Sequence, residues 1–161
     1  MLTRPTTHNH LAERVRRLFG TAPCRLQVAA LPWRDTGNGV EIMLITSRDT
    51  GRWVLPKGWP EAKEPLWAAA REAGEEAGLR GTVSHLEAGR YFYAKVLASG
   101  EEVPCEVLVF PLHVDKIADR WKEKHSRTRK WVNSSEAVRM VNEPDLCQII
   151  AYFCADPHRF S

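Results

Sequence analysis

The chain has 161 residues, 43% of them hydrophobic, which suits one globular domain with its own core and argues against a disordered chain. A formal net charge of +3 is too small to indicate a nucleic-acid partner, and we expect none. The four cysteines form no C-x-x-C pair, which disfavours a zinc site or a disulfide framework. With no long apolar stretch and no secretory signal, we expect a single cytoplasmic domain over residues 1–161, away from membranes.

Residues 1–22 are expected to form an N-terminal helical extension. Leu11, Val15, Leu18 and Phe19 recur at helical spacing among arginines, which predicts a short amphipathic helix docked on the domain. An organellar transit peptide is the alternative, but Glu13 and the shortness of the segment disfavour it.

The next part of the chain predicts strands. Residues 25–33 and 40–47 are rich in aliphatic residues and flank the turn sequence DTGNG, which is typical of a hairpin. A short third strand is expected at 53–56.

Residues 65–77 predict a helix. The segment is rich in Ala, Glu, Leu and Arg, with Pro65 in its first turn and Gly78 at the position of a C-terminal cap.

Strands are expected again at 82–97, 103–112 and 130–132, followed by a helical tail that Ser134 or Ser135 would cap. The whole pattern predicts an α+β domain.

Three glutamates on the predicted helix carry the chemical signal. Glu72 and Glu76 lie one turn apart, and Glu75 lies beside them, so three like charges share one patch. Such a patch suits a divalent cation, and oxygen ligands favour Mg²⁺ or Mn²⁺, which commonly bind substrate phosphates as well. We expect Ala69, Ala70, Ala73 and Ala77 on the opposite face of the helix to pack closely on a sheet.

Residues 58–79 resemble the Nudix box, G-x5-E-x7-R-E-U-x-E-E-x-G-U, where U is aliphatic. REAGEEAGL, from Arg71 to Leu79, matches the Arg, Glu and Gly positions, with Ala73 at the aliphatic position. RWVLPKG resembles the strand and loop that enter the box. The resemblance, which we place over residues 24–156, implies an α/β/α sandwich with a mixed β-sheet between helices.

One departure lies in the first half of the box. Five residues separate Gly58 from Glu64 as in the family, but six rather than seven separate Glu64 from Arg71. Counting backward from Arg71 instead puts Lys63 and Lys57 at the first glutamate and glycine positions. The deletion leaves the role of Glu64 open.

The resemblance assigns roles to the remaining positions. Glu72, Glu75 and Glu76 would bind the metal, with one of them as a candidate base, and the Gly58 carbonyl would be a further ligand. Arg71 would orient a carboxylate, a role that its planar fork suits.

Cationic side chains are candidates for binding substrate phosphates. Residues 120–130, RWKEKHSRTRK, form a basic segment that is either a flexible surface loop or a phosphate clamp. The candidate substrate-binding residues are Arg48, Arg52, Lys57, Arg127, Arg129 and Lys130. Trp59, Trp67 and Tyr91 are either nucleobase-stacking or packing residues, and Glu106 is expected to point outward rather than to the metal.

The expected activity is metal-dependent hydrolysis of a phosphoanhydride bond in a nucleoside-diphosphate-linked compound. Within the family, the sequence most resembles the diadenosine and diphosphoinositol polyphosphate phosphohydrolases, which implies a dinucleoside or inositol polyphosphate substrate. The alternatives are an RNA 5′-pyrophosphohydrolase and a catalytically silent binding module with the same fold. The resemblance also allows a homodimer, which no sequence feature decides.

Overall fold

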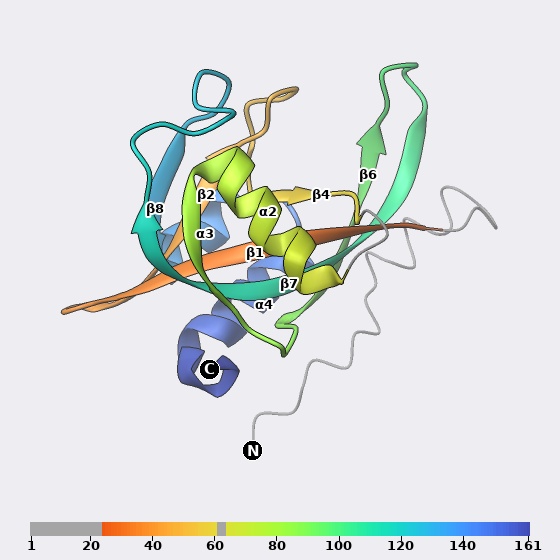
Figure 1. The fold of residues 1–161 in the computed structure, drawn as a ribbon. Coiled ribbons are helices and arrows are strands. Elements are labelled where there is room, and N and C mark those ends of the chain that lie inside the picture. The colour runs from red at the N-terminus through yellow and green to blue at the C-terminus, as the bar shows by residue number, and fades with distance from the viewer. Residues whose placement is uncertain (1–23, 61–63) are drawn as a thin grey trace.

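A mixed β-sheet between helices organises the part of the chain that the computed structural model describes, residues 24–60 and 64–161 (Figure 1). Helix α2 (Pro65–Ala77) covers one face of the sheet, and α3 (Ser134–Met140) and α4 (Pro144–Ala155) cover the other. This arrangement confirms the predicted α+β sandwich. The predicted helix around Leu11 to Phe19, with the extension 1–22, lies outside the described residues.

The sheet is ordered β3-β2-β1-β7-β5, with β4 beside β1, β6 beside β7 and β8 beside β2. Strands β1 and β7 pair in parallel, and the other pairs are antiparallel. The strands are β1 (Arg25–Thr36), β2 (Gly39–Thr46), β3 (Trp53–Val54), β4 (Lys57–Gly58), β5 (Leu79–Val83), β6 (Gly89–Val96), β7 (Glu102–Ile117) and β8 (Arg129–Asn133).

Strand β1 is apolar on both faces because the sheet is covered on both sides. Val28 and Ala30 pack in the core under α2, whereas Ala29, Leu31 and Trp33 pack in the core under α4. The predicted hairpin is present, with Thr36 paired to Gly39 across the turn. Consecutive residues of β1 therefore face opposite sides of the sheet.

The predicted continuous strand 82–97 is wrong. Strands β5 and β6 pair with different stretches of β7, Leu112–Ile117 and Glu102–Val109 respectively, so the chain must leave the edge of β7 between them. The connection is anchored by backbone hydrogen bonds from Ser84 to Pro111 and from Ala88 to Val109. Strand β4 was not predicted, because two residues are too few to show a periodic pattern.

The helical tail is divided into α3, α4 and a 3₁₀ turn at Pro157–Phe160. The predicted cap at Ser134 or Ser135 is wrong: the Asn133 side chain accepts a hydrogen bond of 2.9 Å from the Glu136 backbone N–H. The serine hydroxyl of Ser135 instead donates to the same Asn133 oxygen.

Helix α2 has the predicted bounds. It ends at Gly78, whose φ of +67° is the left-handed conformation that glycine adopts without steric cost. Within residues 24–60 and 64–161, no helix is both long and apolar enough to pass through a bilayer.

Candidate functional site

Helix α2 packs on the sheet through small residues, which brings its carboxylates close to the strands. Ala69, Ala73 and Ala77 are fully buried. Ala70, expected in this set, is only half-buried, and Ala68 takes its place. The expectation that the carboxylates lie opposite the alanines is wrong for Glu72 and Glu76.

Glu72 and Glu76 are themselves buried, at 8% and 7% exposed, along the margin of the alanine face. A helix turns by about 100° per residue, so positions directly before Ala73 and Ala77 adjoin the packed surface rather than oppose it. Two carboxylates are thus held at the helix–sheet boundary.

Gly58 of β4 lies directly against the Glu72 carboxylate. A Cβ atom at this glycine would stand 2.3 Å from Glu72 Oε1, so only glycine leaves room for the side chain. The structure therefore places Gly58, and not Lys57, opposite the helix. Glu64, directly before α2, is exposed and makes no side-chain cap.

Arg71 holds Glu72. Its Nη2 donates to Glu72 Oε1 at 2.8 Å and to the Trp59 carbonyl oxygen at 3.1 Å, and the guanidinium lies over the Trp67 ring. One side chain thus ties the first turn after β4 to a carboxylate of α2, which limits the rotation of both.

Glu76 is held by two donors from different parts of the chain. The Lys57 backbone N–H donates to Oε2 at 3.1 Å, and Arg127 Nη2 donates to Oε1 at 2.8 Å. Burial raises the pKa of Glu76 to about 7, against the opposing effect of the Arg127 guanidinium. A nearby cation would offset the free-energy cost of burying the charged form of this carboxylate.

The Glu75 side chain is more exposed than those of the other two glutamates. Its Oε2 lies 3.4 Å from Lys122 Nζ on the exposed side of α2. Among residues 24–60 and 64–161, no group of three or more His, Cys, Asp or Glu side chains is arranged to hold a metal ion. Glu72 and Glu76, with room created by Gly58, nonetheless supply the oxygen donors that Mg²⁺ and Mn²⁺ prefer.

Most cations of the basic segment are engaged in structural contacts. The Arg127 side chain is only 8% exposed and also donates to Glu123 and to the Thr46 carbonyl oxygen. Arg129 donates to the carbonyl oxygens of Ala77 and Ala118, at 2.7 Å each, and stacks on Trp121.

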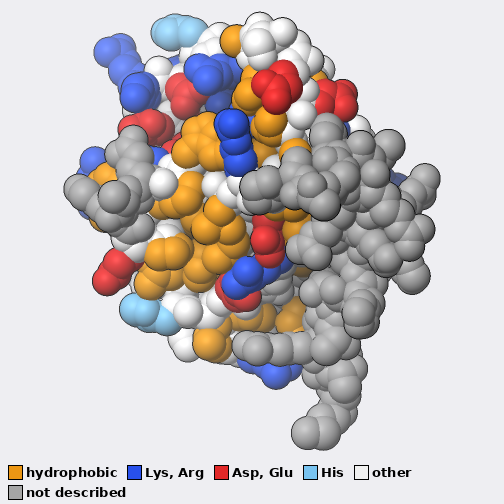
Figure 2. Space-filling view, turned by 90° about the vertical axis from the view of Figure 1, so that its right-hand side faces the viewer, with side chains coloured by type: hydrophobic (Ala, Val, Ile, Leu, Met, Phe, Trp, Pro, Cys, Tyr) orange, Lys and Arg blue, Asp and Glu red, His pale blue; other side chains and the backbone are white. Residues whose placement is uncertain are grey.

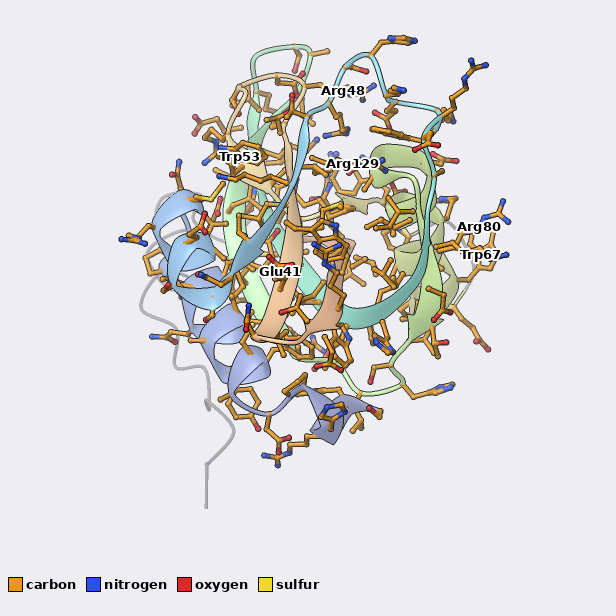
Figure 3. All side chains as sticks on the ribbon, turned by 90° about the vertical axis from the view of Figure 1, so that its left-hand side faces the viewer. Glu41, Arg48, Trp53, Trp67, Arg80 and Arg129 are labelled. Carbon is orange, nitrogen blue, oxygen red and sulfur yellow. The ribbon has the colours of Figure 1, made fainter. Side chains whose placement is uncertain are left out.

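The side chains of Lys130 and Arg48 are more exposed than those of Arg127 and Arg129. Lys130 pairs with Glu136 of α3 at 3.6 Å, and Arg48 pairs with Glu123 at 3.3 Å. Figure 3 shows Arg48 and Arg129 at the same end of the molecule, with Trp67 on the outer side of α2. Side chains of the basic segment therefore contact α2 near its end, and Arg48 lies beside this segment.

A second charged group lies on the opposite side of β4. Lys57 is oriented toward Tyr93, with Nζ 5.0 Å from the ring centroid, and burial lowers its pKa while Glu76 and Glu143 oppose that effect. Arg52 lies 3.6 Å from Glu143, which is 9% exposed. Sequence reasoning missed Glu143 and Glu123, because each stands alone in a segment without a motif.

The aromatic candidates differ in position. Tyr91 is 2% exposed and belongs to the core under α4, so it is a packing residue. Trp59, directly after β4, is 38% exposed, and Trp67, in the first turn of α2, is 45% exposed. Glu106 accepts from Arg90 at 3.2 Å and does not contact the carboxylates of α2.

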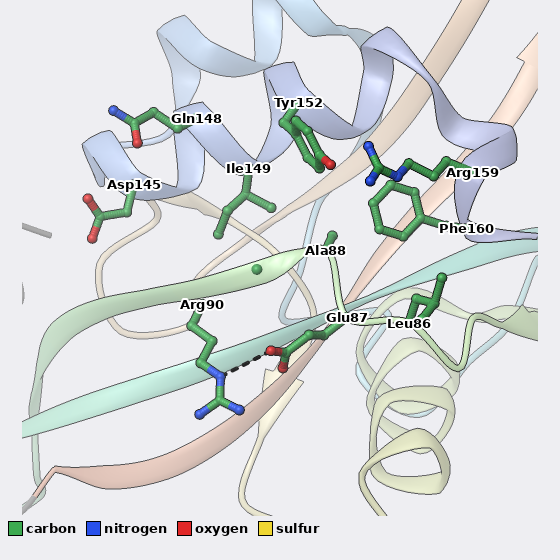
Figure 4. Close-up of a pocket in the computed structure, with 11 residues that line it drawn as sticks. Leu86, Glu87, Ala88, Arg90, Asp145, Gln148, Ile149, Tyr152, Arg159 and Phe160 are labelled. Carbon is green, nitrogen blue, oxygen red and sulfur yellow. Dashed lines mark hydrogen bonds and ion pairs between the residues drawn. The ribbon is translucent and has the colours of Figure 1, made fainter. Parts of the chain in front are cut away.

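A separate hollow of about 290 Å³ lies between the start of β6 and α4 (Figure 4). Its lining combines apolar side chains such as Ile149, Tyr152 and Phe160 with the Glu87–Arg90 pair, which are 3.3 Å apart. None of the predicted site residues lines it, and we assign it no part in the chemistry.

The chain matches the NUDIX domain model over residues 24–153. It is 31% identical over 133 residues to Nudix hydrolase 12, mitochondrial, of Arabidopsis thaliana, covering 78% of this chain and 66% of that protein. It is 28% identical over 128 residues to diphosphoinositol polyphosphate phosphohydrolase 3-alpha of Mus musculus, covering 78% and 74%. The chain spans less than two thirds of several relatives, including 63% of Nudix hydrolase 21, chloroplastic, of Arabidopsis thaliana.

Solved structures share the fold at lower identity. A C. elegans Ap4A hydrolase binary complex superposes with a TM-score of 0.65 at 20% identity, covering 84% of this chain and 99% of that one. The NUDIX domain of Shewanella oneidensis NrtR, complexed with ADP ribose, superposes with a TM-score of 0.62 at 15% identity, covering 86% and 90%.

Proposed function

This chain belongs to the Nudix domain family, and we propose that it hydrolyses a phosphoanhydride bond in a dinucleoside polyphosphate, a diphosphoinositol polyphosphate or a related nucleoside-diphosphate-linked compound. The observation that carries the proposal is the pair of buried carboxylates, Glu72 and Glu76, held at the helix–sheet boundary beside Gly58. The name of the mouse relative supports a polyphosphate substrate, and those of the Arabidopsis relatives support hydrolysis.

Glu72 and Glu76, with Glu75 and the Gly58 carbonyl oxygen, would hold Mg²⁺ or Mn²⁺. When bound, such a cation would lower the pKa of a bound water and stabilise negative charge on the phosphoryl oxygens. The buried pair fits this role because both carboxylates already depend on cationic partners, Arg71 and Arg127.

The protein's own residues divide the remaining work. Arg71 orients Glu72 through Oε1, and Arg127 and the Lys57 backbone N–H orient Glu76 through its two oxygens. Arg48, Arg52 and Lys57 are proposed to bind phosphates. Arg129 and Lys130 were expected to be candidates for phosphate binding, and we propose instead that Arg129 holds the end of α2 and that Lys130 pairs with α3.

The test is product release from a panel of dinucleoside polyphosphates, diphosphoinositols, nucleotide sugars and 5′-triphosphorylated RNA, with Mg²⁺ or Mn²⁺. We compare wild type with Glu76→Gln and with Glu102→Gln, an exposed residue of β7 that serves as the matched control. We expect metal-dependent turnover that Glu76→Gln lowers by at least about 100-fold, the scale of losing one electrostatic contributor to the transition state, and that the control retains.

Two outcomes would contradict the proposal. Preferred turnover of the RNA, with strongly salt-dependent binding, would favour the RNA 5′-pyrophosphohydrolase. Absence of turnover from a folded protein that binds Mn²⁺ would indicate a silent binding module. The cytoplasmic location remains a prediction, since several relatives are named mitochondrial or chloroplastic.

A further inference from the structure

A polyphosphate substrate carries more negative charge than one metal ion neutralises, so the site needs further cations. The basic segment offers few, because Arg127 and Arg129 are held by Glu76, Glu123 and backbone carbonyl oxygens. Lys130 pairs with α3 on the outer strand β8. The further cations must therefore come from outside the basic segment.

Strands β4 and β6 bring two lysines together. In β4, Gly58 is paired with Val28 and faces α2, whereas Lys57 is paired with Ala29 and faces the α4 side. In β6, Tyr93 and Lys95 alternate onto this same side, and the Lys57 ammonium lies 5.0 Å from the Tyr93 ring.

Aromatic rings flank both ammonium groups. Lys95 Nζ lies 5.7 Å from the ring of Trp59, the residue after Gly58, which is 38% exposed. Figure 2, which views the molecule from the side on which β6 lies, shows Lys and Arg side chains among exposed apolar ones. Flat aromatic surfaces beside cations suit a ligand that combines phosphates with a ring.

The two lysines are close enough to affect one another. The Lys57 ammonium lies over the Tyr93 ring, and Lys95 follows Tyr93 by two residues on the same face of β6. No carboxylate of the described residues lies within 4.0 Å of the Lys95 ammonium. Lys95 is thus a half-buried cation beside a like charge, an arrangement that an anionic ligand stabilises.

We infer that Lys95, with Lys57, forms a subsite for the non-reacting phosphates of the substrate and selects compounds with longer phosphate chains. This inference rests on the proposed function, since it extends the same site. Strand β4 links the two halves: Gly58 lies against the Glu72 carboxylate, and the adjacent residue, Lys57, faces Lys95. Lys95 is a specificity-determining residue in this assignment, and it plays no part in activating water.

The test has a binding arm and a kinetic arm. Inorganic tripolyphosphate is titrated calorimetrically into wild type, Lys95→Gln, Lys95→Arg and the charge-matched control Lys116→Gln, an exposed residue of β7, all in EDTA. We expect Lys95→Gln to weaken binding about tenfold, which corresponds to the loss of ~1.4 kcal/mol, and we expect Lys95→Arg and the control to bind as wild type does.

In the kinetic arm, Lys95→Gln should raise KM for a dinucleoside tetraphosphate while kcat and the KM for a nucleotide sugar stay unchanged. Equal tripolyphosphate binding by Lys95→Gln and Lys116→Gln would overturn the inference, as would a uniform loss of kcat on both substrates. If wild type hydrolyses nothing but binds tripolyphosphate through Lys95, the subsite stands and the hydrolytic proposal fails, so the two are separable.

Discussion

Gly58 shows how a single missing side chain shapes the site. A Cβ atom there would overlap the Glu72 carboxylate, whose nearest atom would be 2.3 Å away. The overlapping group is the end of a flexible side chain, so the fold can absorb the added methyl group by displacing Glu72 from Arg71. We therefore expect the size of residue 58 to affect the position of the Glu72 carboxylate more than the stability of the fold.

We predict that Gly58→Ala weakens Mn²⁺ affinity and lowers kcat by at least about 10-fold, in the range lost when groups that orient metal ligands are altered. The melting temperature should stay close to that of wild type. Gly37→Ala, where an added Cβ meets nothing within 4 Å, is the control. A fully active Gly58→Ala variant would show that Glu72 needs no fixed position.

Arg127 and Glu76 form the most buried ion pair described at the site, with side chains 8% and 9% exposed. Removing one partner of such a pair leaves an uncompensated charge, whereas neutralising both removes most of that cost. The Arg127–Glu76 pair also joins the basic segment to α2, and Arg127 in addition donates to the Thr46 carbonyl oxygen of β2.

We predict that Arg127→Met lowers the free energy of unfolding by roughly 3 kcal/mol, the lower end for breaking a buried pair. The double variant Arg127→Met with Glu76→Gln should recover more than half of that loss. Urea denaturation of the four proteins measures the coupling. Additive losses would mean that Arg127 acts through its other contacts alone.

At the scale of elements, the end of β8 and the start of α3 depend on one side chain. Asn133 accepts from the Glu136 backbone N–H, and no other side-chain cap of α3 is described. Sequence reasoning chose Ser134 or Ser135 because serine is an equally good cap, but β8 runs one residue past the predicted end and moves the boundary to Asn133.

We predict that Asn133→Ala destabilises the protein by about 1 kcal/mol, the usual cost of losing a helix N-cap. Ser134→Ala, in the first turn of the same helix, should change the free energy of unfolding by less than about half of that. Thermal or urea unfolding distinguishes them, and equal losses would contradict the assignment of the cap.

At the scale of the whole molecule, the sheet holds two cores of different character. The core under α2 relies on small helix residues, which lets the carboxylates approach β4, whereas the core under α4 contains large ones such as Leu146, Ile149 and Phe153. The close approach of α2 is thus a packing property of the entire layer.

We predict that Ala73→Leu destabilises the fold by roughly 1–3 kcal/mol, as overpacking of a filled core does, and moves α2 enough to weaken metal binding. Ala70→Leu, at a half-buried position of the same helix, should cost clearly less. Calorimetric melting and Mn²⁺ titration check both effects. A well-tolerated Ala73→Leu would show that the layer has spare volume.

The sequence by itself determined the α+β class, the β1–β2 hairpin, the bounds of α2 and the family. These follow from local periodicity, from Pro and Gly at the ends of a helix, and from the fixed spacing of Arg71, Glu72, Glu75 and Glu76. Such signals lie within one segment, where the chain itself sets the distances.

Only the tertiary structure decided that Arg127 braces Glu76, that Arg129 bonds the end of α2, and that Lys57, Lys95 and Glu143 gather on the other side of β4. It also decided the break between β5 and β6. Each of these depends on pairing between segments far apart in the chain, and the partner of a charged side chain is set by sheet register and burial, which no local pattern records.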